Sequence, residues 1–476
     1  MSTNQPNLLL ITADDMNWDA VGAFGCPTPD TTPNLDRLAS EGRSFELAHV
    51  TIAVCQPSRS AMMTGRYPHN SGGEGFFRLR REGVPILPGV LRGAGYRIGI
   101  LGKLTHSTPY ANFEWDMARD RPELGEGRSP EIYGRYAGEF FRKAAERDKP
   151  FFLMANSHDP HRPFYGNDRE AWYDPHQTNP PAAEPSRTFR PEDVVVPGFL
   201  PDLPEVRREI SEYYNSVRRC DDTVGRILEQ LEQAGLAAET LVLFLSDNGM
   251  AFPFAKTNCY LNSTRTPWIV RWPGRVEPGQ ADDEHFVSGI DIMPTFLDAA
   301  GVESPDGVDG RSFLPVLEGQ HQSGREKVFT EFHQTAARRN YPMRCVQTAR
   351  YGYIWNPWSD GERVFRNESQ SGRTFSAMEH ATDENPEVAA RVDLFLHRVP
   401  EELYDFASDP DARNNLIDDP EYADQLEHLR TAMESWMVEH DDPALVAFRH
   451  REDRAKQEQY LDAMVDELGG TARDDA

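Results

Sequence analysis

Four short apolar runs, each ending in polar residues, constrain the fold of this chain more than any other feature of its sequence. They are "PNLLLITADD" (6–15), "GYRIGILGK" (95–103), "KPFFLMANSHDPH" (149–161) and "TLVLFLSDNG" (240–249). Continuous apolar runs of this length are typical of strands that are buried on both faces of a parallel sheet. Segments with helical periodicity separate the runs, so the alternation predicts an α/β fold.

Two of the intervening segments carry clear helix signals. In "TTPNLDRLASEG" (31–42), Thr32 can cap a helix, Pro33 suits its first turn and Gly42 can end it. The segment 209–235 has the apolar spacing of a long amphipathic helix and ends in a glycine. Both segments fit helices that cover a face of the predicted sheet.

The character of the sequence changes after about residue 336. The segment "MRCVQTARYGYIWN" (343–356) has a strand-like composition and no helical crossover after it, whereas 421–440 has a helical pattern. A chain of 476 residues also exceeds the roughly 250–300 residues at which one core usually stops growing. We therefore predict an α/β domain over 1–336 and a smaller α+β domain over 337–476, which contains an antiparallel sheet and ends in a charged helix or tail.

Charge and hydropathy narrow the classes of partner. The net charge of -27 disfavours nucleic acid, because phosphate binding requires a basic surface. No stretch approaches the roughly 18 apolar residues of a membrane span, and the first residues lack the basic start of a secretion signal. The five cysteines show no spacing of a disulfide framework or a zinc site. These features predict a cytoplasmic protein that binds neither nucleic acid nor a membrane, and they leave its oligomeric state open, a homodimer included.

Chemically useful side chains follow all four apolar runs. In chain order they are Asp14, Asp15, Lys103, His158, Asp159, His161, Asp247 and Asn248. One polar pair after a strand is most often a loop cap. Four such groups are more informative, because ligands of α/β sheets collect beyond the carboxyl ends of the strands. We expect these side chains to share one site.

The segment "CQPSR" contains the pattern C-x-P-x-R, formed by Cys55, Pro57 and Arg59, and "SAMMTGR" continues it. Taken alone, Cys55 could be a thiol nucleophile or a core residue. The whole pattern resembles the signature of the sulfatase family. The resemblance implies that a formylglycine-generating enzyme reads the motif in the unfolded chain and oxidises Cys55 to an aldehyde. It also implies the alkaline phosphatase-like fold, a large mixed sheet between helices, with the catalytic domain in 1–336.

The same resemblance assigns roles to the side chains at the strand ends. The implied metal ligands are Asp14, Asp15, Asp247 and Asn248, together with the modified Cys55. Hard oxygen ligands of this kind suit Ca²⁺, or Mg²⁺ in its place, rather than zinc. Arg59 would stabilise the ionised aldehyde hydrate, and Lys103 and Lys256 would bind the sulfate oxygens. His158 would protonate the leaving group, and His106 would help to release the sulfate and regenerate the aldehyde.

Two positions depart from the family pattern. The usual spacing is a lysine, one residue and a histidine, but "KLTH" puts two residues between Lys103 and His106. An ordinary loop histidine is therefore the competing interpretation of His106. Lys256 stands where the sulfamidase branch of the family has an arginine, which binds sulfate with a planar fork rather than as a point charge.

Four segments sharpen the resemblance toward the N-sulfoglucosamine sulfohydrolases, or sulfamidases. They are "HDPHR", "DVVVPGFLPDLP", "SDNGMAFPFAKTN" and "YPMRCVQ". The implied activity is hydrolysis of a small sulfated sugar, with the N-sulfate of glucosamine as the expected bond. His161, Arg162 and Arg344 would contact the sugar, although the two arginines could equally form surface ion pairs. An O-sulfatase and a phosphodiesterase or phosphonate monoester hydrolase of the same superfamily remain alternatives.

Overall fold

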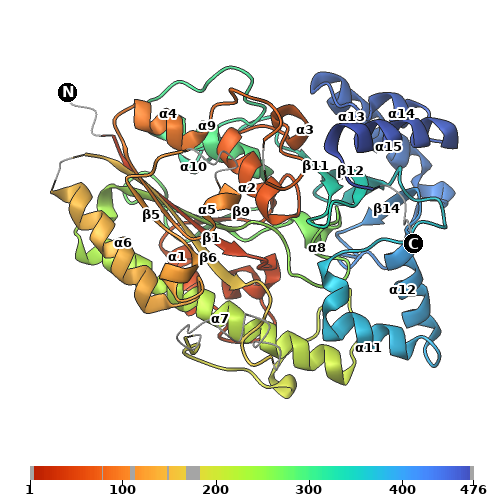
Figure 1. Cartoon of the computed structure of the whole chain (residues 1–476), viewed down its shortest axis with the longest axis horizontal. Helices are drawn as coiled ribbons and strands as arrows, with labels where there is room; N and C mark the ends of the chain where they lie inside the picture. Colours follow the sequence, from red (N-terminus) through yellow and green to blue (C-terminus); the bar gives the residue numbers. More distant parts are fainter. Residues whose placement is uncertain (1–4, 78, 108–112, 147–148, 168–182, 472–476) are drawn as a thin grey trace.

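The computed structural model describes residues 5–77, 79–107, 113–146, 149–167 and 183–471. A mixed eight-stranded sheet forms its centre (Figure 1). In spatial order the strands are β5 (Met117–Arg119), β4 (Arg97–Leu101), β6 (Phe151–Pro160), β1 (Asn7–Asp14), β7 (Thr240–Ser246), β8 (Trp268–Arg271), β2 (Arg43–Phe45) and β9 (Gln280–Asp282). All four predicted strands are present and adjacent in this sheet, as β1, β4, β6 and β7.

The four adjacent strands run in parallel, and their carboxyl ends therefore share one edge of the sheet. The register brings the ends of three of them level: Asp14 of β1 is opposite Pro160 of β6, and Ala13 is opposite Ser246 of β7. The polar residues that follow these strands consequently meet above the middle of the sheet.

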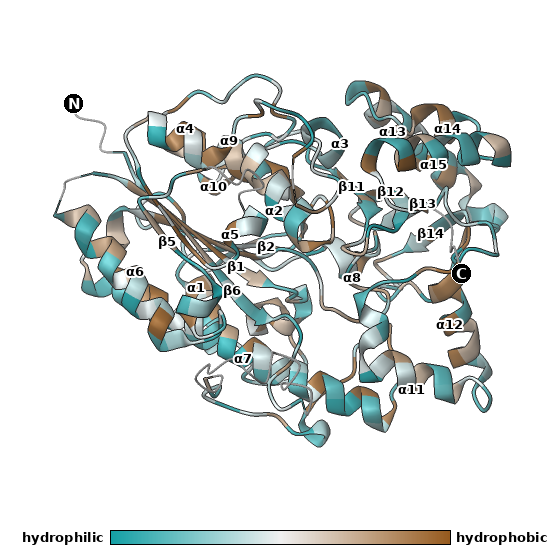
Figure 2. Cartoon of the chain, in the orientation of Figure 1, coloured by the Kyte–Doolittle hydropathy of each residue, from teal (hydrophilic) through white to brown (hydrophobic). Residues whose placement is uncertain are grey.

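Helices cover both faces of the sheet, and the alternation of side chains along β1 shows how. Leu9 and Ile11 belong to the core beneath α1 (Pro33–Ser40), α6 (Pro130–Ala145) and α7 (Pro204–Gln233). Leu8 and Leu10 belong to the core beneath α2 (Cys55–Thr64), α4 (Leu87–Gly93), α9 (Ile292–Ala299) and α10 (Leu314–Leu317). Figure 2 shows the apolar residues concentrated in the central strands, with polar residues on the outer faces of the helices. A sheet buried on both faces explains why the strands lack a polar alternation.

A separate antiparallel sheet forms the C-terminal part of the molecule. Its strands are β11 (Lys327–Gln334), β12 (Asn340–Thr348), β13 (Tyr351–Trp355) and β14 (Glu401–Asp405). Its helices are α11 (Arg373–Ala381), α12 (Pro386–His397), α13 (Ala423–Glu439), α14 (Leu445–Arg449) and α15 (Arg454–Leu468). The predicted antiparallel sheet is therefore confirmed. Its first strand, β11, ends at Gln334, just before the predicted boundary between residues 336 and 337.

The remaining strands and α-helices of the described residues are short. They are a two-stranded sheet of β3 (Ala48–His49) and β10 (Val287–Ser288), and the helices α3 (Pro68–Ser71), α5 (Leu104–Ser107) and α8 (Leu261–Thr264). A third apolar core joins Ala61 of α2 and nearby Tyr67 to Trp436 and other residues of the C-terminal helices. Within the described residues, none of the helices has both the length and the apolar character that crossing a membrane requires.

Candidate active site

The order of residues in "CQPSR" follows from its place on a helix. Cys55 is the first residue of α2, a helix whose ten residues are all buried. Arg59 lies four residues later and so projects from the same face as Cys55. Pro57 sits in the first turn, where a backbone N–H would have no intrahelical acceptor. The spacing therefore places a sulfur, a guanidinium and the free N–H groups of a helix start at one point.

Arg59 anchors α2 to the carboxyl edge of the sheet. Its Nε and Nη2 lie 2.8 and 2.7 Å from Asp247 Oδ2. Its Nη1 donates to Thr12 Oγ1 and Asn156 Oδ1, both at 2.7 Å. The side chain is 0% exposed. Each hydrogen bond to a charged group contributes about 1.5–3 kcal/mol, so Arg59 holds the helix start against β1, β6 and β7.

The carboxylates after β1 and β7 form a single buried cluster. Asn248 Nδ2 donates to Asp15 Oδ1 at 2.7 Å, and the Asp15 N–H donates to Asp247 Oδ1 at 3.1 Å. Cys55 Sγ lies 3.9 Å from Asp15 Oδ1. Asp14, Asp15, Asp247 and Asn248 are all 0% exposed. Three carboxylates packed this closely need positive charge among them.

The chemistry of this cluster fits a hard divalent cation. The Oδ1 atom of Asn248 and both carboxylate oxygens of Asp14 are buried and accept no hydrogen bond. Asp14, Asp15 and Cys55 also place their ligand atoms within 4.8 Å of one another. Burial raises the pKa of the Asp247 carboxyl to about 7, despite the neighbouring Arg59. Buried oxygens that accept no hydrogen bond, beside a carboxyl whose ionisation is disfavoured, are the arrangement that an oxygen-seeking cation relieves.

Two lysines complete the charges of the cluster. Lys103 forms an ion pair with Asp14, and Lys256 Nζ lies 2.9 Å from Asp15 Oδ2. Burial opposes ionisation of Asp14, but Lys103 and other nearby cations hold its pKa well below the usual range. The cations of the cluster are Arg59, Lys103 and Lys256, and its carboxylates are Asp14, Asp15, Asp247 and Glu368. With every group ionised the cluster carries one excess negative charge, which a divalent cation would convert to one positive charge.

The backbone of the cluster adopts conformations that side chains other than glycine rarely favour. Asp15, Lys103, Phe254 and Thr257 all have φ between 53° and 70°. Left-handed residues of this kind cost about 1–3 kcal/mol each, and they tend to occur at functional sites. Here they turn the chain sharply after β1, after β4 and around Lys256.

The two histidines that we assigned to proton transfer lie near Lys103. The Lys103 N–H donates to His158 Nε2 at 3.3 Å. Burial, and then Lys103, lowers the pKa of His158 well below its ordinary value. Gly127 packs on this imidazole, and a Cβ there would lie 2.2 Å from His158 Cδ2. His106 lies on α5 with its ring 6.0 Å from Phe76, and burial lowers its pKa to about 3.

The three residues expected at the sugar have different surroundings. His161 Nε2 lies 3.9 Å from Asp15 Oδ2, so the structure places this histidine at the cluster. Arg162 pairs with the buried Glu209 and lies over the rings of Phe164 and Phe252.

Arg344 corrects our expectation of an exposed arginine at the sugar. It is 1% exposed, and its Nε and Nη2 lie 2.6 and 2.9 Å from Asp442. The guanidinium also lies 3.7 Å from Glu331, which accepts from His69 Nδ1 at 2.7 Å. Arg344 is therefore part of a buried ionic network that joins α3 to the C-terminal sheet, and it is not available to a sugar.

Glu368 joins the site although no motif pointed to it. It lies in the 3-10 turn η8 (Glu368–Ser371), within a polar stretch of the C-terminal part. Glu368 Oε2 accepts from Lys256 Nζ at 2.9 Å, and Oε1 lies 3.5 Å from His161 Nε2. From the sequence we also missed Thr12 and Asn156, which hold Arg59, because both lie inside apolar runs that we interpreted only as strands.

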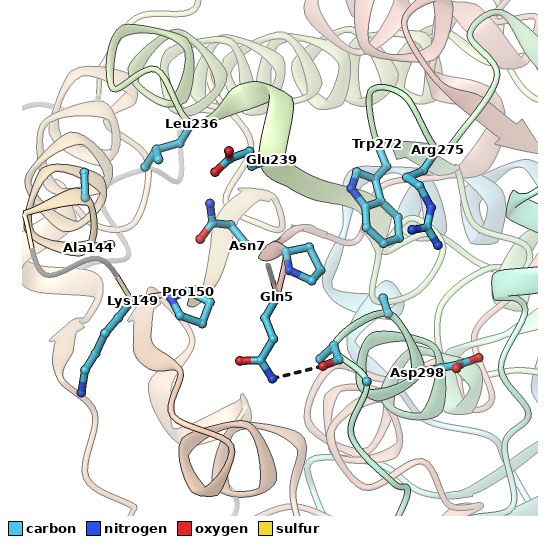
Figure 3. Close-up of a pocket in the computed structure, with 15 residues that line it drawn as sticks. Gln5, Asn7, Ala144, Lys149, Pro150, Leu236, Glu239, Trp272, Arg275 and Asp298 are labelled. Atoms are coloured by element: carbon cyan, nitrogen blue, oxygen red, sulfur yellow. Dashed lines mark hydrogen bonds between the residues drawn. The ribbon is translucent and has the colours of Figure 1, made fainter. Parts of the chain in front are cut away.

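A cavity of about 970 Å³ lies at the opposite edge of the sheet from this cluster (Figure 3). Asn7, Pro150 and Glu239 line it, at the amino ends of β1, β6 and β7. Gln5 Nε2 donates to Ala300 O across one side of the cavity, at 3.2 Å. The cavity is about the length of a strand away from Cys55 and shares no residue with the candidate site.

Known proteins resemble this chain over most of its length. A family model described as sulfatase matches residues 6–302, and one described as N-sulphoglucosamine sulphohydrolase, C-terminal, matches residues 251–361. The chain is 32% identical to human N-sulphoglucosamine sulphohydrolase over 467 residues, which cover 93% of this chain and 91% of the human protein. It is 27% identical to an ulvan-active sulfatase of Formosa agariphila, over 92% of this chain and 76% of that protein.

Solved structures show the same fold. One is a protein in complex with its substrate D-glucosamine-2-N,6-O-disulfate, with a TM-score of 0.68, 19% identity, and coverage of 92% of this chain and 98% of that one. Another is the phosphonate monoester hydrolase of Agrobacterium radiobacter, with a TM-score of 0.64, 21% identity, and coverage of 91% and 96%. At these identities the likeness concerns the fold alone.

Proposed function

This chain belongs to the sulfatase family, and we propose that it removes the sulfate group of a small sulfated sugar, with the N-sulfate of a glucosamine residue as the preferred bond. The observation that carries the proposal is the buried cluster around Cys55. It combines a sulfur at a helix start, three fully buried carboxylates with the partly exposed Glu368 beside them, an amide and three cations. The similarity to the human sulphohydrolase over almost the whole chain supports the N-sulfate.

Two groups absent from the chain as translated would complete the chemistry. A divalent cation held by Asp14, Asp15, Asp247 and Asn248 would supply Lewis-acid polarisation of a sulfate oxygen. Formylglycine at position 55 would supply, as its hydrate, a hydroxyl nucleophile.

The side chains of the protein then have separate tasks. Lys103 and Lys256 neutralise the sulfate oxygens, and Arg59 stabilises negative charge beside position 55. His158 donates a proton to the departing nitrogen, and His106 accepts one during release of the sulfate. Burial, and then Lys103, lower the pKa of His158 well below its ordinary value, which favours the neutral imidazole in the free protein. We propose that the bound anion stabilises the protonated form, because an opposite charge raises the pKa of a histidine.

Two other activities are alternatives to this proposal. An O-sulfatase would use the same cluster on an ester, and among the similar proteins are N-acetylgalactosamine-6-sulfatases at 27–30% identity. A phosphonate monoester hydrolase would use the same fold. Four substrates separate these activities: N-sulfoglucosamine, glucosamine 6-sulfate, an aryl sulfate and an aryl phosphodiester. The proposal requires the first to have the highest kcat/KM with protein that is supplied with Ca²⁺ and modified at Cys55. A higher kcat/KM for the phosphodiester would contradict it.

Replacing His158 with alanine tests the proton donor. A sulfamate leaves as an amine, which needs protonation, whereas an aryl sulfate leaves as a stabilised phenolate. General-acid catalysis accounts for about 10²–10⁴ in rate. We therefore expect His158→Ala to lower kcat on N-sulfoglucosamine by about that factor, and kcat on the aryl sulfate by less than about tenfold. His428, exposed on α13, provides a matched control as His428→Ala. Equal losses on both substrates would show that His158 is not the acid.

Salt dependence tests the size of the substrate. The chain carries a net charge of -27, so its field repels a sulfated polymer at low ionic strength. The screening length falls to about 8 Å at physiological salt. We expect kcat/KM for a long sulfated chain to lie below that for the monosaccharide at low salt and to rise as salt is added. The monosaccharide serves as its own control, because its kcat/KM should change less. A long chain that is the better substrate at low salt would contradict a monosaccharide or chain-end specificity.

A further inference from the structure

Glu368 reaches the cluster from a distant part of the chain. Its side chain is about one-third exposed, whereas Lys256 is 3% exposed and lies beneath it. Burial opposes ionisation of Glu368, but Lys256 and His161 lower its pKa to about 2. Glu368 is therefore a charged group between the buried lysine and the solvent.

Lys256 is held between two carboxylates. Its Nζ lies 2.9 Å from Asp15 Oδ2 and 2.9 Å from Glu368 Oε2. An ammonium has three donors, so these two acceptors leave one N–H and fix its direction. A lysine has a flexible stem and no planar fork, so the position of its charge depends on such anchors more than that of an arginine.

The turn that carries Glu368 is itself fastened to the Lys256 loop. Asn367 Nδ2 donates to Thr257 Oγ1 at 2.5 Å and to Lys256 O at 3.4 Å. Thr257 and Phe254 both have positive φ, so this loop has an unusual conformation on both sides of Lys256. Backbone and side-chain contacts thus fix Glu368 relative to Lys256 at the same time.

We propose that Glu368 is a positioning residue, which aims the ammonium of Lys256 at the sulfate group of the substrate. The inference rests on the proposed function insofar as Lys256 binds sulfate. Glu368 itself need not touch the substrate. It takes over part of the geometric role that a planar guanidinium would have at position 256.

The direction of the change in sulfate affinity distinguishes a positioning role of Glu368 from a purely electrostatic role. Removing a carboxylate near an anion site weakens repulsion, so a purely electrostatic role predicts tighter sulfate binding in Glu368→Ala. Loss of an anchor predicts the opposite. One charge-assisted hydrogen bond corresponds to about tenfold in affinity. We expect Glu368→Ala to weaken binding of inorganic sulfate about tenfold, and Glu368→Gln, which keeps an acceptor oxygen, to weaken it less.

Calorimetric titration of inorganic sulfate into Ca²⁺-supplied protein measures this effect without any sugar. Glu379→Gln is the matched control. Glu379 is exposed on the neighbouring α11, and its substitution removes the same negative charge. Glu368 is partly exposed, so its variants should fold, and a melting curve for each variant checks this. Unchanged or tighter sulfate binding by Glu368→Ala would overturn the proposal.

A double-mutant cycle tests whether Glu368 acts through Lys256. In the Lys256→Gln background, Glu368→Ala should change sulfate affinity and the kcat/KM of an aryl sulfate by less than about twofold, because coupled residues are not additive. An equal loss in both backgrounds would show direct contact with the substrate and overturn the inference. The sugar panel decides the proposed function separately. If no sulfated sugar is hydrolysed but sulfate affinity still depends on Glu368, only the assignment of the sugar fails.

Discussion

Replacing Cys55 with alanine is expected to lower turnover of every sulfated substrate by at least about 10⁴-fold, because removal of a covalent nucleophile has effects of this size. The fold should tolerate the change. Cys55 is 4% exposed, and its Sγ makes only a long, weak polar contact with Asp15 Oδ1, at 3.9 Å. Losing its sulfur removes little buried area and should lower the free energy of unfolding by about 1 kcal/mol. The melting temperature should therefore fall by at most a few degrees.

Cys345→Ala is the matched control for this experiment. Cys345 is a buried cysteine in β12, away from the cluster, and the same substitution there should leave turnover unchanged. Peptide mass spectrometry of the unsubstituted protein reports whether position 55 carries a cysteine or an aldehyde. Turnover of Cys55→Ala within tenfold of the parent protein would exclude a nucleophile at this position.

Removing the divalent cation should have the second large effect. With chelator, we expect activity to be lost and the melting temperature to fall, because a cation that binds only the folded state at 100 times its Kd stabilises it by about 2.7 kcal/mol. Adding Ca²⁺ back should restore both properties. A protein that is indifferent to chelator and contains no metal by elemental analysis would exclude the site.

The pH dependence of the cation-free protein gives a second readout of the same site. The Asp247 pKa is raised from its ordinary value near 3.8 to about 7 in the folded state. The unfolded chain therefore releases this proton first, and Asp247 makes the folded state less stable as pH rises from about 4 to about 7. Asp14 has a lowered pKa and therefore contributes to stability in the opposite sense, but its contribution changes only at pH values below about 4, outside this window. We expect the chelated protein to lose stability across this window, and Ca²⁺ to reduce the loss.

The sequence predicted those parts of the site that depend on local patterns. Asp14, Lys103, His158 and Asp247 each follow an apolar run, and parallel strands bring such ends to one edge. The spacing of Cys55 and Arg59 is likewise a property of a single helical turn. For these residues, strand prediction and motif spacing were sufficient to place them together.

Long-range pairs could not be predicted in the same way. Glu368 is 112 residues from Lys256, and Arg344 is 98 residues from Asp442. Nothing next to Arg344 in the sequence indicates that its partner, Asp442, follows α13 in the chain. A member of a buried ionic network was therefore mistaken for an exposed side chain. β11, which precedes the predicted boundary near residue 336, likewise pairs with a later strand, β12, and nothing in its local sequence announces that pairing.

The complete burial of α2 restricts when Cys55 can be modified. The helix rests on β1 and β7, and the ribosome delivers β7 roughly 190 residues after Cys55. At about 5–20 residues per second, this delay is on the order of 10–40 seconds. If position 55 is oxidised as we propose, the modifying enzyme has that interval, during translation, to reach an extended segment. Slowing synthesis between residues 55 and 246 should therefore raise the fraction of protein that carries the aldehyde, and fast overexpression should lower it.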